Sequence, residues 1–255
     1  MKLGLNIRPL PVGAPSLRAH AIAGYTAPAR LVRNHVDYRP GMFGNDEAGD
    51  CTCVAIANAI LAQVALSGYR VGITTAEVLA LYSAVTGYDP ARPVTDTGAY
   101  EVDVLRHQAA HGFQADGQTA YVGLWGNIGP GDLTLARVAM SRFGSAYLAL
   151  NLAQADQQGT TVWDTDTPVS YGDPTPGSWG GHAVLAWDYT GLADSDTVRI
   201  VTWGRLQRAT WRWFRSRVVE VHAIWHPQLA GPGHAFQGVD VDRLRADMAT
   251  FGSVA

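Results

Sequence analysis

The chain has few cysteines and few charged residues, and each shortage excludes a class of protein. It holds two cysteines among 255 residues, Cys51 and Cys53, which stand too close in sequence to form a good disulfide or to join distant segments. We therefore expect a reducing compartment and no disulfide framework. Charged residues make up 16% of the chain and the formal net charge is -3, so the charge balance indicates neither a nucleic-acid partner nor an anionic membrane surface.

Long apolar runs are also missing. No apolar stretch reaches the ~18 residues that cross a bilayer. Prolines interrupt the opening residues MKLGLNIRPLPVGAP before a signal-like apolar region develops. The sequence therefore predicts a cytoplasmic protein with no membrane partner. Hydrophobic residues, at 47% of the chain, suffice for the core of one large domain.

Composition divides the chain into three segments. Residues 1–43 contain repeated prolines and arginines with little periodic pattern, which predicts an extended arm. Residues 44–226 are the expected main domain. Residues 227–255 form a tail with one short helix, on which Leu244 and Met248 share an apolar stripe. A basic, proline-rich arm suits wrapping around a partner subunit, so any self-assembly is expected to use the arm and the tail helix.

The first half of the main domain has helical periodicity. Residues 51–66, CTCVAIANAILAQVAL, are apolar nearly all round, which is typical of a helix inside a domain, and Gly68 suits its C-terminal cap. Thr74 and Glu77 have the spacing of a capping box at the start of the next helix. Two further helices are expected in TDTGAYEVDVLRHQAAHGF and GDLTLARVAMSRFG.

After residue 145 the period shortens to that of strands. Aromatic and β-branched residues alternate with others in SAYLALNL, GHAVLAWDYTG, DTVRIVTWG, ATWRWFRS and VVEVHAIWH. Helices followed by an antiparallel sheet predict an α+β fold. A long loop rich in Pro, Gly and Ser, residues 164–180, ends beside His182, and loops of this length inside a compact domain are often functional.

The placement of the two cysteines indicates nucleophilic chemistry. A cysteine at a helix N-terminus lies among unpaired backbone N–H groups and the positive end of the helix dipole, which favour the thiolate. Such a nucleophile needs a histidine as proton partner and donors for the oxyanion. His182 follows a double glycine at a strand start, and Asn45 stands six residues before Cys51. The Asn45 amide and the Cys51 backbone N–H are the candidate oxyanion donors.

This constellation resembles the papain-like cysteine peptidase superfamily. That superfamily has a glutamine six residues before its nucleophile, where Asn45 stands here, and a Gly-His-Ala-Val stretch around its base, which GGHAV matches at His182. A following strand typically ends in Asn-Ser-Trp-Gly, and VTWG occupies Val201 to Gly204 here. The Gly-Asp-Cys-Thr and Thr-Trp-Gly stretches are most similar to papain-like proteins encoded by bacteriophages and their bacterial hosts.

The resemblance implies a fold and an activity. The fold would have a helical half with a central buried helix beginning at the cysteine, and a second half made of an antiparallel sheet. The activity would be a thiol hydrolase in which Cys51 and His182 cleave a peptide or isopeptide bond without a cofactor. A peptide-like substrate or a protein partner would then bind the cleft, which Trp203 and Trp179 are candidates to line, although sheet packing also explains aromatic residues in strands.

Two departures from the family pattern bear on catalysis. Asn45 is one methylene shorter than glutamine, and Val201 stands where the family has the asparagine that orients its base. Asp188 shares a strand face with His182 but lies ~20 Å along it, out of reach. Thr202, or an acid from the turn at residues 192–196, is left to hold the base. The site is therefore either a working Cys–His pair or a degenerate one.

The nucleophile and the function both have alternatives. Cys53 is the second candidate nucleophile, but it lies roughly 200° around the helix from Cys51 and suits core packing. A non-catalytic structural or interaction module, for example a virion component, is the alternative function, and a self-processing enzyme whose arm occupies its own cleft is a variant of the first. His107 and His111 stand one helical turn apart without an evident third ligand, so no metal is expected.

Overall fold

The computed structural model describes residues 1–255 apart from 21–24, 69, 116–117, 158–160, 230–239 and 253–255. Its α-helices are α1 (Leu17–His20), α2 (Cys51–Leu66), α3 (Thr75–Thr86), α4 (Glu101–His111), α5 (Leu133–Arg142), α6 (Trp211–Arg217) and α7 (Val241–Gly252). Its strands are β1 (Phe113–Ala115), β2 (Gln118–Tyr121), β3 (Leu124–Ile128), β4 (Ala146–Leu152), β5 (Val162–Trp163), β6 (Gly180–Tyr189), β7 (Thr197–Thr202), β8 (Arg205–Thr210) and β9 (Val218–Trp225).

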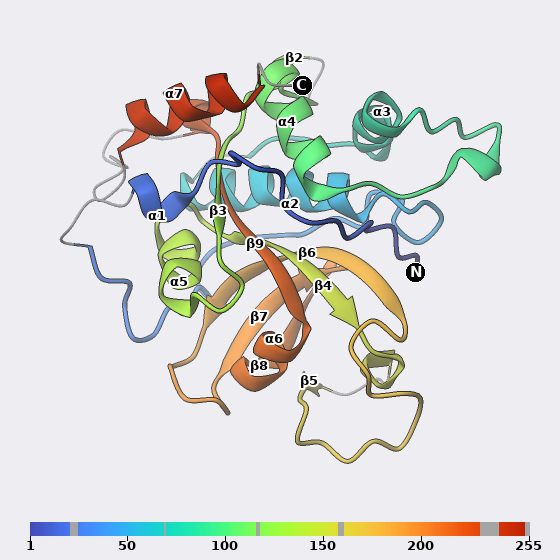
Figure 1. The fold of residues 1–255 in the computed structure, drawn as a ribbon, viewed down its shortest axis with the longest axis vertical. Coiled ribbons are helices and arrows are strands. Elements are labelled where there is room, and N and C mark those ends of the chain that lie inside the picture. Colours follow the sequence, from blue (N-terminus) through green and yellow to red (C-terminus); the bar gives the residue numbers. More distant parts are fainter. Residues whose placement is uncertain (21–24, 69, 116–117, 158–160, 230–239, 253–255) are drawn as a thin grey trace.

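Most of the strands form one sheet. Its order is β3-β9-β4-β6-β7-β8-β5, and its pairs are antiparallel except the short β5–β8 pair at one edge. In Figure 1 α2 runs through the middle of the molecule, with α4 on one side of it and the sheet on the other. The predicted α+β class, with helices before the sheet, is confirmed.

The central helix α2 is buried because it is apolar on nearly every face. Thirteen of its 16 residues are buried, and many are alanines, which let the neighbouring elements approach closely. The polar residues it buries have partners: Asn58 exchanges two hydrogen bonds with the Gly41 backbone, and Gln63 donates to the carbonyls of Phe143 and Ile224 at 2.9 and 3.0 Å. The predicted central helix is thereby confirmed.

Local sequence signals identified the start of one helix correctly and misassigned another stretch. Thr74 and Glu77 form the predicted capping box at α3. The stretch ATWRWFRS was expected to be a strand, and that prediction is wrong beyond Thr210, where a strand ends and α6 begins. The Thr210 side chain accepts from the Trp213 N–H and caps the helix. Strands β1 to β3, between α4 and α5, were not predicted.

The predicted arm packs on the main domain. Leu17 is fully buried, and Ser16 forms a bridge with Asn127 of β3. The Arg33 side chain is buried and donates to the carbonyls of Met140, Gly144 and Trp187 at 2.6 to 2.8 Å. Much of the arm is therefore held by backbone acceptors of the same chain.

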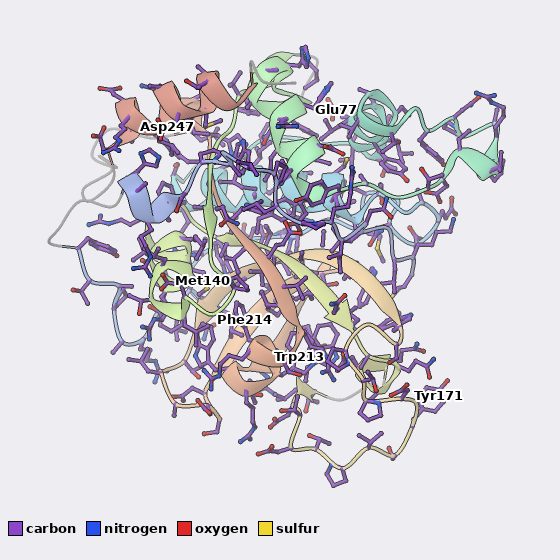
Figure 2. The ribbon with its side chains drawn as sticks, viewed as in Figure 1. Glu77, Met140, Tyr171, Trp213, Phe214 and Asp247 are labelled. Carbon is purple, nitrogen blue, oxygen red and sulfur yellow. The ribbon has the colours of Figure 1, made fainter. Side chains whose placement is uncertain are left out.

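The tail helix α7 lies over β3 and α1, as Figure 1 shows. Leu244 and Met248 are buried, and the Met248 sulfur accepts from the Trp125 N–H at 3.3 Å. Figure 2 shows Asp247 on this helix, and its carboxylate lies 3.1 Å from His20 Nε2 of α1. Over the described residues, none of the helices has both the length and the apolar character to span a bilayer.

Candidate active site

Cys51 is the first residue of α2 and lies against β6. Asp50 occupies the N-cap position without a side-chain cap bond, so the first turn has backbone N–H groups with no intrahelical partner. The Cys51 Sγ accepts from the Ala183 N–H at 3.4 Å. Ala183 follows His182 in β6, so the fold brings the two predicted catalytic residues together although 130 residues separate them in sequence.

His182 is held on two sides. Its Nε2 lies 2.8 Å from the Thr202 Oγ1, and its ring stacks on Trp203 with centroids 4.4 Å apart and planes 16° apart. Its Nδ1 is buried and has no hydrogen-bond partner among the described residues. Thr202 therefore occupies the orienting position, and Nδ1 is the ring nitrogen left to exchange a proton with a thiol.

Trp203 has an unusual backbone conformation. Its φ is 44° and that of Gly204 is 68°, which makes a tight turn between β7 and β8. A bulky residue with positive φ is uncommon and needs compensating contacts. Trp203 stacks on His182, lies 5.5 Å from the Trp179 ring, and its Nε1 donates to the Lys2 carbonyl at 3.4 Å. Of the two predicted cleft tryptophans, Trp203 therefore contacts the histidine and Trp179 contacts Trp203.

Asp188, which strand length excludes as the residue that orients the base, has partners elsewhere. The Asp188 carboxylate forms an ion pair with Arg199 and accepts from the Arg33 backbone N–H at 2.9 Å. It lies at the far end of β6 from His182. This position agrees with the expectation from strand length that Asp188 cannot hold the base.

Asn45 lies in the loop that leads into α2. Its side-chain amide donates to the Ala48 carbonyl at 3.1 Å and also interacts with the Asp50 carboxylate, so in this arrangement it is engaged within the loop. Its backbone carbonyl accepts from the Lys2 N–H at 2.8 Å. Burial raises the pKa of the neighbouring Asp50 to about 7, against the smaller effect of the Asn45 side chain, which lowers it.

Cys53 lies wholly inside the core. It is fully buried, and its sulfur lies 3.9 Å from the Thr52 hydroxyl. Burial raises the pKa of its thiol well above the ordinary range. A neutral thiol without solvent access is inert, so this position suits packing.

A segment of the arm, residues 2–6, passes over the cysteine. The Leu5 N–H donates to the Gly181 carbonyl at 3.3 Å, and the Asn6 N–H donates to the Ala99 carbonyl at 2.9 Å. The Ala99 N–H donates in return to the Gly4 carbonyl at 2.8 Å. The segment therefore binds two walls through its backbone, in the way that an extended peptide adds to a sheet edge.

Glycines make this close approach of backbones feasible. A Cβ at Gly181 would overlap the Leu5 carbonyl oxygen, and a Cβ at Gly98, whose φ is 73°, would overlap the Gly4 carbonyl oxygen. Gly4 itself lies so close to Gly49 that a side chain there would overlap the Gly49 backbone. The groove is thus shaped for an extended backbone, and residues 2–6 fill it.

An ion pair fixes one end of this segment. Lys2 Nζ lies 2.7 Å from the Asp96 carboxylate, which also accepts from the Tyr82 hydroxyl at 2.7 Å and from the Gly49 N–H. Burial alone would raise the pKa of Asp96, but these hydrogen bonds from Lys2, Tyr82 and Gly49 lower it.

Burial, to which the segment contributes, favours the neutral forms of the cysteine and the histidine. Burial raises the pKa of Cys51 to about 12, although the N–H groups of Ala183 and Gly4 beside the sulfur lower it. Burial lowers the pKa of His182 to about 3. At neutral pH this arrangement holds a thiol and an uncharged imidazole. Formation of a thiolate and an imidazolium requires that the groove open to water.

Sequence reasoning missed the groove wall formed by Gly98 and Ala99, and it missed the Lys2–Asp96 ion pair. Ala99 and Gly98 stand in the turn before α4, and the only signal for them was a glycine ahead of a helix start. Lys2 and Asp96 are 94 residues apart and carry no shared motif. Gly181 belongs to the double glycine that did mark the start of β6.

Solved structures with a similar fold are cysteine proteases. The chain aligns over 88% of its length, and 95% of the other chain, with xylellain, a cysteine protease from Xylella fastidiosa, at a TM-score of 0.59 and 12% identity. It aligns with digestive procathepsin L 3 of Tenebrio molitor at a TM-score of 0.57 and 14% identity, covering 83% of this chain and 75% of that one. The cysteine protease and lectin-like domains of Cwp84 from Clostridium difficile give 0.53 and 10%, covering 82% and 56%.

These similarities establish the fold. At 10–14% identity they concern the shared architecture and not the chemistry. The predicted papain-like fold is confirmed. No protein-family model and no curated protein sequence matches the chain, and the similarity to phage-encoded proteins stays a prediction.

Proposed function

We propose that the protein is a thiol hydrolase that cleaves a peptide or isopeptide bond, and that residues 2–6 cover its groove in the resting state. The observation that carries the proposal is the contact of the Cys51 Sγ with the amide next to His182, whose ring is oriented by Thr202 and Trp203. The similarity in fold to xylellain, procathepsin L 3 and the cysteine protease domain of Cwp84 supports the same chemistry.

The reaction uses the chain's own groups. His182 Nδ1 takes the thiol proton while Nε2 donates to the Thr202 hydroxyl, and the Cys51 sulfur attacks the substrate carbonyl carbon. The Cys51 backbone N–H donates to the oxyanion, and the Asn45 amide donates to it as well once it turns away from Asp50. His182 returns the proton to the leaving amine, and water then hydrolyses the acyl-enzyme. No cofactor enters these steps.

The groove favours an extended peptide as substrate. Gly181 on one side and Ala99 on the other offer backbone groups that bind any extended chain regardless of its side chains. Residues 2–6 use these groups and present an N–H, that of Gly4, to the sulfur. A peptide group that turns its N–H to the nucleophile is poorly placed for attack on its carbonyl, which suits a cover rather than a substrate.

The test is the pH dependence of Cys51 alkylation by iodoacetamide, read by mass spectrometry, in a Gly4→Ala protein whose cover cannot seat. An inflection below the free-thiol value of ~8.5 that moves upward in Gly4→Ala/His182→Ala supports the Cys–His pair. Cys53→Ala is the control, and it should leave the profile unchanged. A profile indifferent to His182, or one that follows Cys53, would overturn the proposal.

A second function is a non-catalytic interaction module, for example a part of a phage particle. The observation in its favour is the closed groove, in which burial keeps the pKa of Cys51 at about 12 and that of His182 at about 3. In that case the arm and α7 would contact other subunits, and the thiol would stay unreactive after the cover is displaced.

A further inference from the structure

Three buried side chains outside the Cys51–His182 pair form a separate cluster. Glu101 is the first residue of α4, and Glu220 and His222 lie on the same face of β9, two residues apart. Glu101 and His222 have no exposed surface, and Glu220 is 8% exposed. The cluster joins α4, the helix that follows one groove wall, to β9, which lies next to the edge strand β3.

The spacing of the ligand atoms is that of a metal site. His222 Nε2 lies 3.4 Å from the Glu220 carboxylate and 3.5 Å from the Glu101 carboxylate, and the three ligand atoms lie within 4.8 Å of one another. Hydrogen bonds between charged groups are shorter, about 2.7–2.9 Å. Four ligands at about 2.0–2.2 Å from a tetrahedral ion lie about 3.3–3.6 Å apart, which agrees with both distances.

The described part of the protein gives the Glu101 carboxyl group no hydrogen-bond partner. Both Glu101 oxygens are buried without a hydrogen-bond partner among the described residues. Within the same residues, His222 is the ion-pair partner of both glutamates, and no Lys or Arg lies within 4 Å of either carboxylate. Two buried carboxylates without a cation are costly. A divalent cation would neutralise both.

We propose that Glu101, Glu220 and His222 bind a divalent transition-metal ion, with zinc the best match, at three of its four coordination positions, and that the ion joins α4 to β9. One imidazole and two carboxylates suit zinc, whereas calcium and magnesium prefer larger sets of oxygen ligands. The imidazole plane is fixed by the Trp125 ring at 5.5 Å and the Tyr147 ring at 6.2 Å.

The ion would also steady the groove. Glu101 stands two residues after Ala99, whose N–H and carbonyl hold Gly4 and Asn6. A bond from Glu101 through the ion to β9 would therefore fix the wall that contributes Ala99. The site shares no ligand with the proposed hydrolase, so either proposal can fail without the other.

The first test measures zinc retention by the full chain. Protein stripped with a chelator is incubated with zinc chloride, passed over a desalting column and analysed by mass spectrometry of the metal. We expect about one zinc per chain in the wild type and in two controls, Cys51→Ala, which removes the thiol, and His107→Ala, which breaks the other histidine pair. Glu101→Gln and His222→Asn should lose it.

Three results would overturn the proposal: no retained zinc in the wild type, loss of zinc in Cys51→Ala or His107→Ala, or full retention in a folded Glu101→Gln. If Glu101→Gln does not fold, the visible spectrum of cobalt bound to the Cys51→Ala/His107→Ala protein decides. Bands of a tetrahedral site without thiolate charge transfer support the cluster, and their absence contradicts it. Zinc, but not magnesium, should raise the unfolding temperature of the same protein.

Discussion

Replacing Gly4 by alanine should expose the Cys51 thiol. A Cβ at this position would overlap the backbone of Gly49, which cannot move away as a flexible side chain could. The segment of residues 2–6 must therefore leave its seat, and its hydrogen bonds to Ala99 and Gly181 are lost with it. Water then reaches the sulfur, and the desolvation that holds the pKa of Cys51 at about 12 is relieved.

The size of the effect follows from the thiolate fraction. Near neutral pH each unit in pKa changes the thiolate fraction tenfold. A fall from about 12 to the free-thiol value of ~8.5 raises that fraction about 3,000-fold. If the rest of the protein still causes half of the increase in the pKa of Cys51, the thiolate fraction rises about 50-fold. We therefore expect iodoacetamide to label Cys51 at least about 50 times faster in Gly4→Ala than in the wild type, about 3,000 times faster if the thiol regains its free pKa, and faster still if His182 stabilises the thiolate.

The assay is the rate of Cys51 alkylation at pH 7.5, followed by mass spectrometry of the Cys51 peptide. Gly131→Ala is the matched control, because a Cβ there meets nothing within 4 Å and the rate should stay at the wild-type value. Equal rates in Gly4→Ala and the wild type, with circular dichroism spectra unchanged, would refute the reasoning that residues 2–6 bury the thiol.

Three further changes test the base, the ion pair and the arm. In the Gly4→Ala background, Thr202→Val should lower the alkylation rate at pH 7.5 about tenfold by removing the partner of His182 Nε2. Thr202→Ser keeps the hydroxyl and should not lower the rate. Equal rates in Thr202→Val and Thr202→Ser would exclude Thr202 as the orienting residue. The pKa of Asp96 is lowered in the folded state, so its contribution to stability is present above its ordinary pKa of ~3.9 and disappears as the pH falls through its folded value. Asp96→Asn should therefore reduce the loss of stability at acid pH, measured as urea unfolding midpoints from pH 7 to pH 2. A loss equal to that of the wild type would contradict this. Leu17→Ala should reduce the free energy of unfolding by about 2–5 kcal/mol, because Leu17 is fully buried. Leu10→Ala, at a site 36% exposed, should reduce it far less. Equal losses would show that the arm does not belong to the folded core.

The sequence predicted elements whose signals lie within a few residues. A nearly continuous apolar run identified α2, and the Thr74–Glu77 spacing identified the start of α3. The stretch after Thr210 was misassigned because its tryptophans and arginines alternate like those of a strand. The Thr210 cap and the burial of Trp213 and Phe214, which lie beside the strands in Figure 2, favour a helix instead.

Tyr171 lies on the long loop of residues 164–180, at the edge of Figure 2, and its side chain is exposed.

Local sequence patterns do not identify which residue orients the His182 imidazole. The family pattern puts the orienting position at Val201, but the hydroxyl that meets His182 belongs to Thr202, the next residue. Neighbouring residues of a strand point to opposite faces, so a shift of one residue changes the face completely. Pairing of β7 with β6, with Val201 opposite Leu185, fixes which of the two can face the histidine.

By itself, the sequence determined the α+β class, the buried helix that begins at Cys51 and the strand that begins near His182, because helix propensity, capping and apolar periodicity act over short distances along the chain. Only the tertiary structure decided that Thr202 holds the imidazole, that residues 2–6 fill the groove and that Glu101 meets Glu220 and His222. These contacts join residues about 20 to 180 positions apart, and they form only when the packing of α2 and α4 against the sheet brings their backbones together.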